Sequence, residues 1–305
     1  MKALIYKSTG NFYQAKDENG RWCQCRIRGK LKLDKSISTT NPVAVGDWVT
    51  LADTVDPEGL STILTILPRQ NYIIRSAINL TFQRHIIAAN MDLAVLVASL
   101  KNPFTSQGFM DRFLVTAEAY HIPALVVFNK ADMHTGNTLL AWKNKKRILE
   151  QAGYPTLTVS GQAGEGIDEI KGVLKNKTTL FCGHSGVGKS TLINKIMPGL
   201  DLKTGQVSES NEKGRHTTTF AQMFDLDFGG RLIDTPGIKE LGLVDIKKEE
   251  LSHYFPEMAE RLNDCRFNNC LHANEPGCAV KAAVSEGDIS TERYESYLNL
   301  LDSLT

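Results

Sequence analysis

A glycine-rich loop in the middle of the chain has the residue types and spacing of a phosphate-binding site. It fits the pattern G-x-x-x-x-G-K-[ST] and lies between a predicted strand and a predicted helix: Gly183-His184-Ser185-Gly186-Val187-Gly188-Lys189-Ser190. Glycines let successive backbone N–H groups point at phosphate oxygens, and the helix that follows adds the positive end of its dipole. We expect Lys189 to reach the β- and γ-phosphates, Ser190 to ligate Mg²⁺, and Thr191 to join the nucleotide contacts.

A second motif, N-K-x-D, indicates that the base is guanine. Asn129-Lys130-Ala131-Asp132 follows a predicted buried strand, 124–128. The Asp132 carboxylate can accept hydrogen bonds from the ring N1–H and the exocyclic amine of guanine, whereas adenine lacks both donors and would leave the charge unpaired. Asn129 is expected to brace neighbouring loops, and the stem of Lys130 to cover the ring. Alone the motif is weak, because Asp132 could cap a helix instead, but beside a phosphate loop it favours GTP.

Two further segments follow predicted strands directly. Ser160-Gly161 comes after the strand 156–159, and a backbone N–H there is expected to bond the guanine O6. Asp234-Thr235-Pro236-Gly237 fits D-x-x-G after the strand 231–233. We expect Asp234 to hold Mg²⁺ through water and the Gly237 N–H to sense the γ-phosphate. Either segment is weak evidence alone, and its place after a strand makes it credible.

The segment before D-x-x-G has the residues of a switch that closes over GTP: Gly214-Arg215-His216-Thr217-Thr218-Thr219. One threonine is expected to complete the Mg²⁺ shell, with Thr218 and Thr219 preferred. Many GTPases carry a water-orienting glutamine just after D-x-x-G, but here that position is Ile238, so intrinsic turnover should be slow. His216 is the preferred catalytic residue, with Arg215 as an alternative finger in cis. An exposed residue that contacts a partner is an equal interpretation of each.

The order of these motifs is circularly permuted. In ordinary small GTPases the phosphate loop comes first, whereas here N-K-x-D and Ser160-Gly161 precede it. Ligands of such folds bind outside the carboxyl ends of the strands, so position in space matters and order in the chain does not. The permutation makes D-x-x-G lead directly into the C-terminal region. We hypothesise that the change from GTP to GDP pulls on that region.

A cluster near the C-terminus has the ligands and spacing of a structural zinc site. Three cysteines and one histidine follow the pattern C-x4-C-x-H-x5-C: Cys265, Cys270, His272 and Cys278. Together they form a complete tetrahedral set for one zinc ion, which would supply much of the folding energy of so small a module. Cys23 and Cys25 share a strand face and are expected to be core or surface thiols, and Cys182 is expected to be buried.

The pattern of predicted elements indicates three domains, in agreement with a length of 305 residues. Residues 1–68 contain five short strand-like runs, including 43–52, which suggest an all-β barrel of the oligonucleotide-binding (OB) type. In residues 69–245 strands alternate with helices, which predicts a parallel α/β sheet for the permuted GTPase domain, with a hairpin of 222–228 and 231–233 at its edge. Residues 246–305 form a small α-rich, zinc-binding domain.

The net charge and the lengths of the apolar runs bear on which partners and which cellular compartment we expect. The net charge of +1 gives no global sign of nucleic-acid binding. One local stretch is basic, and it could either follow a nucleic-acid backbone or form a solvated face: Arg21, Arg26, Arg28, Lys30, Lys32 and Lys35, against Asp34 alone. The N-terminus lacks the apolar stretch of a signal peptide, and the longest apolar run, 93–98, is too short to span a bilayer. We expect a cytoplasmic monomer without membrane contact.

As a whole, the chain resembles the ribosome small subunit-dependent GTPase A family (RsgA, also called YjeQ). The resemblance covers the permuted motif order, the switch segment 214–219, the cysteine and histidine pattern, Val45-Gly46-Asp47-Trp48-Val49 and Ala88-Ala89-Asn90-Met91-Asp92. It implies a cytoplasmic GTPase that binds the small ribosomal subunit late in its assembly and is stimulated by it. It also implies rRNA contacts through the barrel and zinc modules, and a role for His216 in hydrolysis. Glycine at Gly161 departs from the commoner alanine, but a backbone contact survives that change.

Three rival functions remain open at this point. One is a permuted GTPase that acts on the large subunit, although the N-terminal barrel and the zinc cluster argue against it. Another is a nucleotide-gated RNA-binding assembly protein with little turnover. The third is a zinc-dependent nucleic-acid module with a vestigial nucleotide site, which predicts no GTP binding at all.

Overall fold

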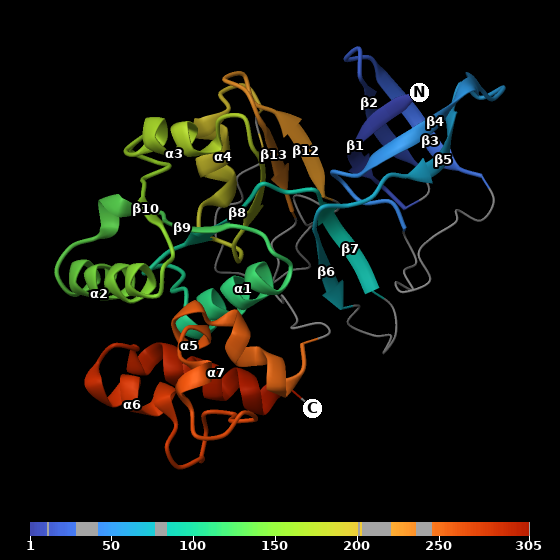
Figure 1. Cartoon of the computed structure of the whole chain (residues 1–305). Coiled ribbons are helices and arrows are strands. Elements are labelled where there is room, and N and C mark those ends of the chain that lie inside the picture. The colour runs from blue at the N-terminus through green and yellow to red at the C-terminus, as the bar shows by residue number, and fades with distance from the viewer. Residues whose placement is uncertain are drawn as a thin grey trace, which may run out of the picture.

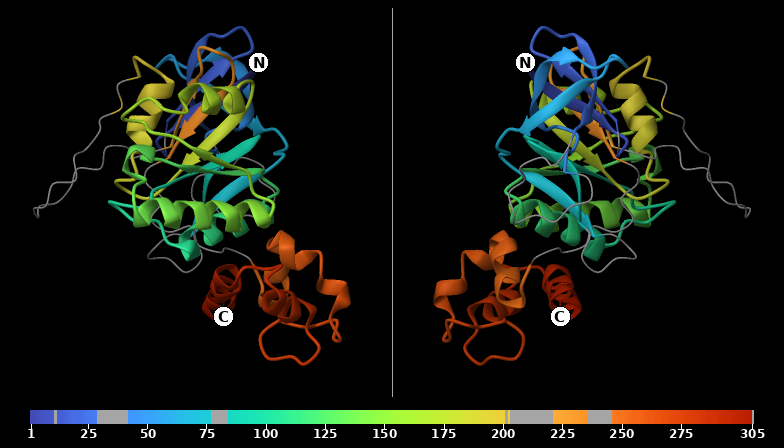
Figure 2. Two further views of the ribbon diagram at one scale, coloured as in Figure 1. Left: turned by 90° about the vertical axis from the view of Figure 1, so that its left-hand side faces the viewer. Right: turned by 90° about the vertical axis from the view of Figure 1, so that its right-hand side faces the viewer.

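The structure is a computed structural model that describes residues 1–10, 12–28, 42–76, 84–200, 202, 221–235 and 246–304. An N-terminal barrel, a central α/β unit and a helical C-terminal module lie in sequence order (Figure 1). Two side views show the C-terminal module projecting from the helices on one face of the central unit (Figure 2).

Five short strands close into the N-terminal barrel: β1 (Lys2–Ser8), β2 (Tyr13–Asp17), β3 (Trp22–Ile27), β4 (Trp48–Val55) and β5 (Ser61–Ile66). Their order is β1-β2-β3-β5-β4, and β4 pairs back onto β1 with Lys2 opposite Thr50. Only the β3–β5 pair is parallel. The interior holds small and β-branched side chains together with Tyr13 and the thiol of Cys25. The predicted five-stranded barrel is therefore confirmed.

The expected strand 43–52 begins only at Trp48. Residues before it form a turn in which the Asp47 carboxylate accepts the Ala44 N–H at 2.8 Å and a forked bond from Arg69, with Nε and Nη2 both at 2.7 Å. Gly46 has φ +90°, and a Cβ there would overlap the carbonyl oxygen of Ala89. The apolar run is buried as expected, but this close approach of two backbones replaces strand geometry with a turn.

The central sheet contains five parallel strands in the order β10-β9-β8-β11-β13: β8 (Leu93–Ala98), β9 (Ala124–Phe128), β10 (Thr156–Thr158), β11 (Thr178–Cys182) and β13 (Arg231–Asp234). Alternate residues of β8 enter two different cores. Ala94 and Leu96 pack with α1 (Gln107–Ala119) and α2 (Asn137–Gln151). Val95 and Val97 pack with α3 (Ile167–Leu174) and α4 (Lys189–Ile196). The predicted sheet, covered on both faces, is thus confirmed.

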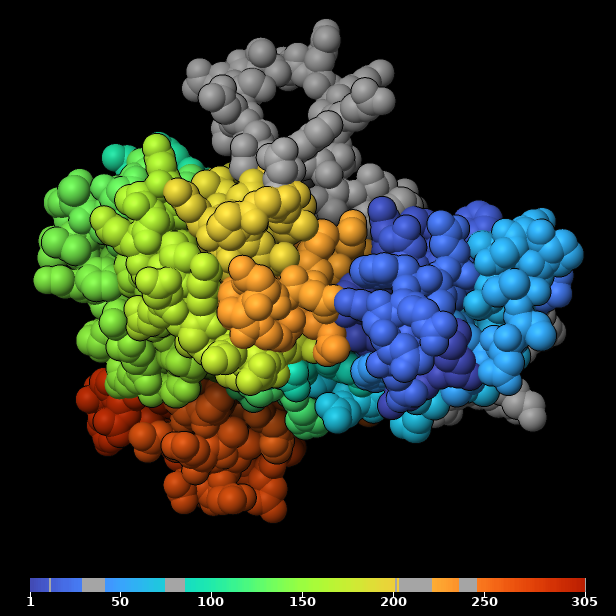
Figure 3. All heavy atoms as spheres, turned by 90° about the horizontal axis from the view of Figure 1, so that it is seen from above, coloured from blue at the N-terminus to red at the C-terminus, as the bar shows by residue number. Residues whose placement is uncertain are grey.

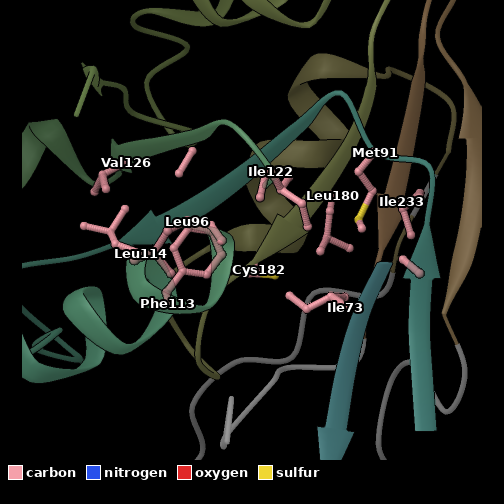
Figure 4. Packing of buried hydrophobic residues seen from close by; sticks show 14 of the residues in the cluster. Ile73, Met91, Leu96, Phe113, Leu114, Ile122, Val126, Leu180, Cys182 and Ile233 are labelled. Carbon is pink, nitrogen blue, oxygen red and sulfur yellow. The ribbon is translucent and has the colours of Figure 1, made fainter. Parts of the chain in front are cut away.

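The first of these cores reaches from α1 across the sheet to the barrel side. Figure 4 shows Phe113 and Leu114 of α1 against Leu96, with Cys182, Leu180 and Ile233 further along. The Cys182 side chain is buried in its strand, as expected, and burial raises the pKa of its thiol to about 12.

The hairpin predicted at the sheet edge has a covered outer strand. β12 (Gln222–Asp225) runs antiparallel to β13, and its first residue also pairs with Lys7 of β1. Asp225 accepts a hydrogen bond from the Tyr6 hydroxyl at 2.5 Å and forms an ion pair with Lys16 at 2.6 Å. The barrel and the central unit therefore share one continuous sheet, and they lie in contact in the space-filling view (Figure 3). Because this edge is covered, it does not need charged side chains or a β-bulge to prevent pairing with another chain.

A second hairpin was not expected from the sequence. β6 (Tyr72–Ser76) and β7 (Arg84–Ala89) form their own two-stranded sheet between the barrel and β8. Ile73 and Ala88 enter the large core shared with α1. The adjacent isoleucines at 73–74 and 86–87 were the available signal, since β-branched pairs favour strands.

The C-terminal module consists of short helices around a small apolar core: η2 (Lys248–Tyr254), α5 (Pro256–Ala259), η3 (Leu262–Asp264), α6 (Ala279–Glu286) and α7 (Thr291–Ser303). It docks on α1, and Val115 of α1 belongs to its core. At the centre of the contact the buried Arg293 meets Asp111 of α1 at 2.6 Å and grips Glu257 with two bonds of 2.7 and 2.9 Å. Burial disfavours the charge of Arg293, but the two carboxylates outweigh it and raise its pKa.

Within the described ranges, no helix combines the length and the apolar character needed to cross a bilayer.

Arg293→Met should destabilise the contact between the C-terminal module and α1 by about 3–5 kcal/mol, because it leaves two carboxylates without their buried cation. Two experiments measure this loss: the free energy of unfolding in denaturant, and the rate of hydrogen exchange in α1 and α7. Arg261→Met is the matched control: its ion pair with Asp288 (3.0 Å) is solvent-exposed, so its cost should stay within about 1 kcal/mol. Equal costs for the two variants would contradict the assigned role of Arg293.

Candidate functional site

The parallel strands carry four of the predicted nucleotide segments to one edge of the sheet. N-K-x-D follows β9, Ser160-Gly161 follows β10, the phosphate loop follows β11, and Asp234 ends β13. Because β8 to β11 and β13 all run in the same direction, the segments after them emerge at the same carboxyl edge. The permuted order along the chain thus coexists with an ordinary arrangement in space.

A single buried carboxamide joins three of these segments. The side chain of Asn129 donates from Nδ2 to the Val187 carbonyl of the phosphate loop at 2.9 Å. Its Oδ1 accepts the Gly161 N–H at 3.0 Å. Gly188 has φ +88°, and a Cβ there would lie 2.5 Å from Asn129 Nδ2, so only glycine fits against this bridge. The phosphate loop, N-K-x-D and Ser160-Gly161 therefore form one connected unit.

Lys130 and Asp132 are held from opposite sides. The ammonium of Lys130 donates to the carbonyl of Gly186 in the phosphate loop at 2.9 Å, and also to the Asn102 carbonyl. Burial lowers the pKa of Lys130, against the opposing field of Asp132. The Asp132 carboxylate accepts the Ser160 hydroxyl at 2.5 Å while its residue stays exposed. This bond fixes one oxygen of a carboxylate whose residue is exposed at the sheet edge.

The phosphate end of the edge brings a cation and a carboxylate together. Lys189 forms an ion pair with Asp234 and donates to the Thr235 carbonyl at 2.6 Å. Asp234 is almost fully buried at the end of β13, and Thr235 is tied to the Phe181 carbonyl by its hydroxyl at 3.1 Å. Ser190 and Thr191 lie half-buried at the start of α4. The residues predicted to serve phosphate and Mg²⁺ are thus neighbours.

Thr105 also contacts this site, although no sequence motif includes it. Its hydroxyl lies 2.8 Å from Nε2 of His184 in the phosphate loop. The His184 ring also meets Phe109 of α1 edge-on, with 5.2 Å between ring centroids. No local pattern marks Thr105, because its role depends on two strands that lie far apart in the sequence.

Several predicted residues lie outside the described part of the chain: Arg215, His216, Thr217, Thr218, Thr219, Gly237, Ile238, Lys30, Lys32, Asp34 and Lys35. Of the basic stretch in the barrel, Arg26 is bonded to Asp56 at 2.6 Å and Glu58 at 3.0 Å. Arg21 is largely exposed, beside the exposed indole of Trp22. Arg26 is thus paired with carboxylates of the barrel itself.

The four predicted zinc ligands converge in the C-terminal module. One ligand atom from each lies within 4.8 Å of the others. Nδ1 of His272 points into the group, 3.3 Å from the Cys278 sulfur and 3.6 Å from that of Cys265. Ligands that bind zinc tetrahedrally at about 2.0–2.3 Å lie about 3.3–3.8 Å apart, so a small contraction would fit the ion. Burial lowers the pKa of His272 and favours the neutral imidazole that metals bind.

A second layer holds these ligands in place. The Glu275 carboxylate accepts the backbone N–H groups of Leu271 at 2.9 Å and of Ala273 at 3.0 Å. From α7, the hydroxyls of Tyr294 and Tyr297 donate to the carbonyls of His272 at 2.6 Å and Leu271 at 2.7 Å. The loop that carries the histidine is therefore tied to the helix that docks on α1. The second ring nitrogen of His272, Nε2, is buried and has no hydrogen-bond partner among the described residues.

Comparisons with known proteins agree with this architecture. Residues 66–244 match the family described as RsgA GTPase, and residues 2–60 match the RsgA N-terminal domain. Proteins named small ribosomal subunit biogenesis GTPase RsgA are 49% identical in Flavobacterium psychrophilum and in Christiangramia forsetii. The alignments cover 99% of this chain in both cases, and 93% and 96% of the two relatives.

Two solved structures have the same fold over nearly the whole chain. YjeQ from Thermotoga maritima superposes with a TM-score of 0.79 at 35% identity, covering 99% of this chain and 98% of the other. YloQ, described as a circularly permuted GTPase, gives 0.74 at 30% identity, with 99% and 94% covered. The family matches, the relatives and the solved structures agree with one another, and this chain belongs to the RsgA GTPase family.

Proposed function

We propose that this GTPase binds GTP at the carboxyl edge of its central sheet and couples hydrolysis to the small ribosomal subunit late in subunit assembly. The observation that carries the proposal is the Asn129 bridge, which ties a guanine-type motif to a phosphate-type loop through bonds of 2.9 and 3.0 Å. The names of the relatives support the ribosomal part.

In this proposal the base lies against Asp132, which accepts from the two guanine donors, and against Lys130, whose stem covers the ring. A bond from Ser160-Gly161 to O6 requires one of its two N–H groups to leave its present acceptor, which is the Glu165 carbonyl for Ser160 and Asn129 Oδ1 for Gly161, each at 3.0 Å. The Ser160 hydroxyl already orients the Asp132 carboxylate, so little ordering remains to be done when the nucleotide arrives.

The phosphates lie in the loop Gly183–Ser190, with Thr191 behind it, and Lys189 neutralises their charge. The Ser190 hydroxyl and Asp234, with Thr218 or Thr219, would hold Mg²⁺, which supplies charge neutralisation at the β- and γ-phosphates. The ion pair between Asp234 and Lys189 supports assigning both residues to the phosphate end of the site. We assign the γ-phosphate contact to the N–H of Gly237.

His216 is the residue that we assign to hydrolysis, with Arg215 as the alternative. The position after D-x-x-G, where many GTPases carry a water-orienting glutamine, is Ile238 in this chain. Turnover should therefore be low without a partner.

The barrel and the zinc module are the parts that we assign to rRNA. On the barrel, the indole of Trp22 is exposed and Lys16 Nζ lies 5.5 Å from its ring centroid, a pairing of cation and aromatic ring that suits a phosphate and an unstacked base. The cysteine and histidine cluster would hold one structural zinc ion. We further propose a monomer that works in the cytoplasm and makes no membrane contact.

Asp132→Asn should weaken GDP binding at least about a hundredfold, because two charge-assisted hydrogen bonds to guanine are lost. It should also strengthen binding of xanthosine diphosphate, whose C2 carbonyl can accept from the new amide. Calorimetry with both nucleotides measures the change in their relative affinities. Asp227→Asn, on the turn between β12 and β13, is the control and should bind GDP normally. Unaltered preference in Asp132→Asn would remove the assigned pocket.

Cys270→Ser should lower the zinc content from about one ion per chain to almost none and expose the amides of the C-terminal module to exchange. Cys23→Ser, in the barrel and half-buried, should keep its zinc. Metal analysis and hydrogen exchange on both proteins check this. A Cys270→Ser protein with full zinc and full protection would mean that the cluster is not the metal site.

Isolated small subunits should raise GTP turnover, whereas large subunits should not. His216→Ala should lower the stimulated rate by about a hundredfold while GDP affinity stays the same. Arg215→Ala, measured in parallel, decides between the two candidates. The partner assignment would be overturned if large subunits stimulated the unmodified chain, or if neither subunit did. The assignment of the catalytic residue would be overturned if His216→Ala kept the full stimulated rate.

A further inference from the structure

The segment between β8 and α1 is closed at its base by Thr105. The Ser99 N–H donates to the Thr105 hydroxyl at 3.0 Å, and the Thr105 N–H donates to the Ser99 carbonyl at 2.7 Å. Thr105 is fully buried. At the tip of the same segment the Asn102 carbonyl accepts from Lys130 of N-K-x-D. The segment is therefore fixed both to the end of β8 and to the guanine motif.

The same hydroxyl binds the phosphate loop through His184, at 2.8 Å. While accepting the Ser99 N–H, the hydroxyl can either donate its proton to Nε2 or accept one from it, so the bond forms with either tautomer of the imidazole. Phe109, one turn into α1, supports the other side of the ring. Thr105 thus links the phosphate loop to the start of α1.

The helix continues from this junction to the C-terminal module. Ser106 caps it by accepting the Phe109 N–H at 3.2 Å. Asp111 lies six residues after Thr105, about 9 Å along the helix axis. There it accepts bonds from Gln107 at 2.8 Å and from Arg293 of α7 at 2.6 Å. Asp111 and Arg293 are both almost fully buried, so this end of the connection is as firmly held as the first.

We propose that Thr105 is a positioning residue for GTP hydrolysis, which holds the phosphate loop on α1 and so couples nucleotide binding to the C-terminal module through Asp111 and Arg293. The proposal rests on the proposed function only in taking the loop Gly183–Ser190 as the phosphate site. A chain of contacts couples two sites only if a change at one site alters the other. Here the change is nucleotide binding at the phosphate loop, and the site expected to respond is the C-terminal module.

Thr105→Val tests the coupling, since valine keeps the shape and removes the hydroxyl. His184→Phe breaks the same bond from the other side and leaves the Ser99–Thr105 pair intact. Thr105→Ser restores the hydroxyl. Thr116→Val is the matched control: Thr116 is equally buried in α1, but its hydroxyl bonds only the Arg112 carbonyl of its own helix, at 2.7 Å.

The first measurement is hydrogen exchange in α7 with and without GDP. In the unmodified chain, Thr116→Val and Thr105→Ser, GDP should slow this exchange. In Thr105→Val and His184→Phe the effect should fall to less than about a third. The proposal is overturned if GDP leaves α7 unchanged in the unmodified chain, or if Thr105→Val keeps the full effect.

The second measurement is basal GTP turnover without ribosomal subunits, which keeps this test independent of the ribosomal assignment. Thr105→Val should lower kcat about tenfold with KM changed less than about threefold, because a shifted phosphate loop spoils alignment more than binding. A purely structural role would lower thermal stability and leave kcat per folded molecule at the Thr116→Val level, and that result would overturn the proposal.

Discussion

The side chain of Asn129 is the contact on which the nucleotide site depends. It is buried, and it spends one donor and one acceptor on two loops that come from different strands. A buried carboxamide that lost either partner would be left with an unsatisfied polar group, so the two loops hold each other in register. The bridge also explains why Gly188 must be glycine, since any side chain there would enter the space of the amide. Recognition of the base and of the phosphates is thereby fixed as one geometry.

Permutation leaves this geometry intact and changes what is attached to it. The barrel joins through β1, which extends the sheet beyond β12. The C-terminal module joins through α1, which packs on β8 and β9 at one face of the sheet. On the barrel side, β13 lies next to β12 and ends at Asp234. On the side of the C-terminal module, α1 begins just after the loop that contacts Lys130 and His184. Each added domain is therefore fixed to an element whose end reaches the nucleotide edge.

Features set by short-range chemistry could be predicted from the sequence. The strand 178–182 and the glycine-rich loop after it follow from local backbone requirements, and the cluster Cys265–Cys278 follows from the spacing that a metal imposes on nearby ligands. The alternation of strands and helices in the central unit likewise follows from local apolar patterns, and helix α3 is one of the helices found there.

Features set by distant contacts could not be predicted. The pairing of β12 with β1 joins residues more than 200 positions apart, and no local pattern encodes it. The turn at Gly46 depends on the backbone of Ala89, so the apolar run 43–52 by itself predicts a strand that the structure shortens. Thr105 looks like any loop threonine until β11 places His184 beside it. Each of these residues gains its role from a partner that only the folded chain supplies.

The ion triad of Arg293, Asp111 and Glu257 shows what kind of constraint the C-terminal contact supplies. Apolar side chains of the same size could hold the two parts as tightly, since desolvation offsets much of the attraction in a buried ion pair. They would also tolerate small shifts of α7 along α1. A guanidinium whose Nε and Nη2 bond Glu257 while Nη1 bonds Asp111 tolerates almost none. We interpret the triad as a device for register: it fixes where α7 lies on α1, and Tyr294 and Tyr297 of that helix pass the same register on to the loop that carries His272.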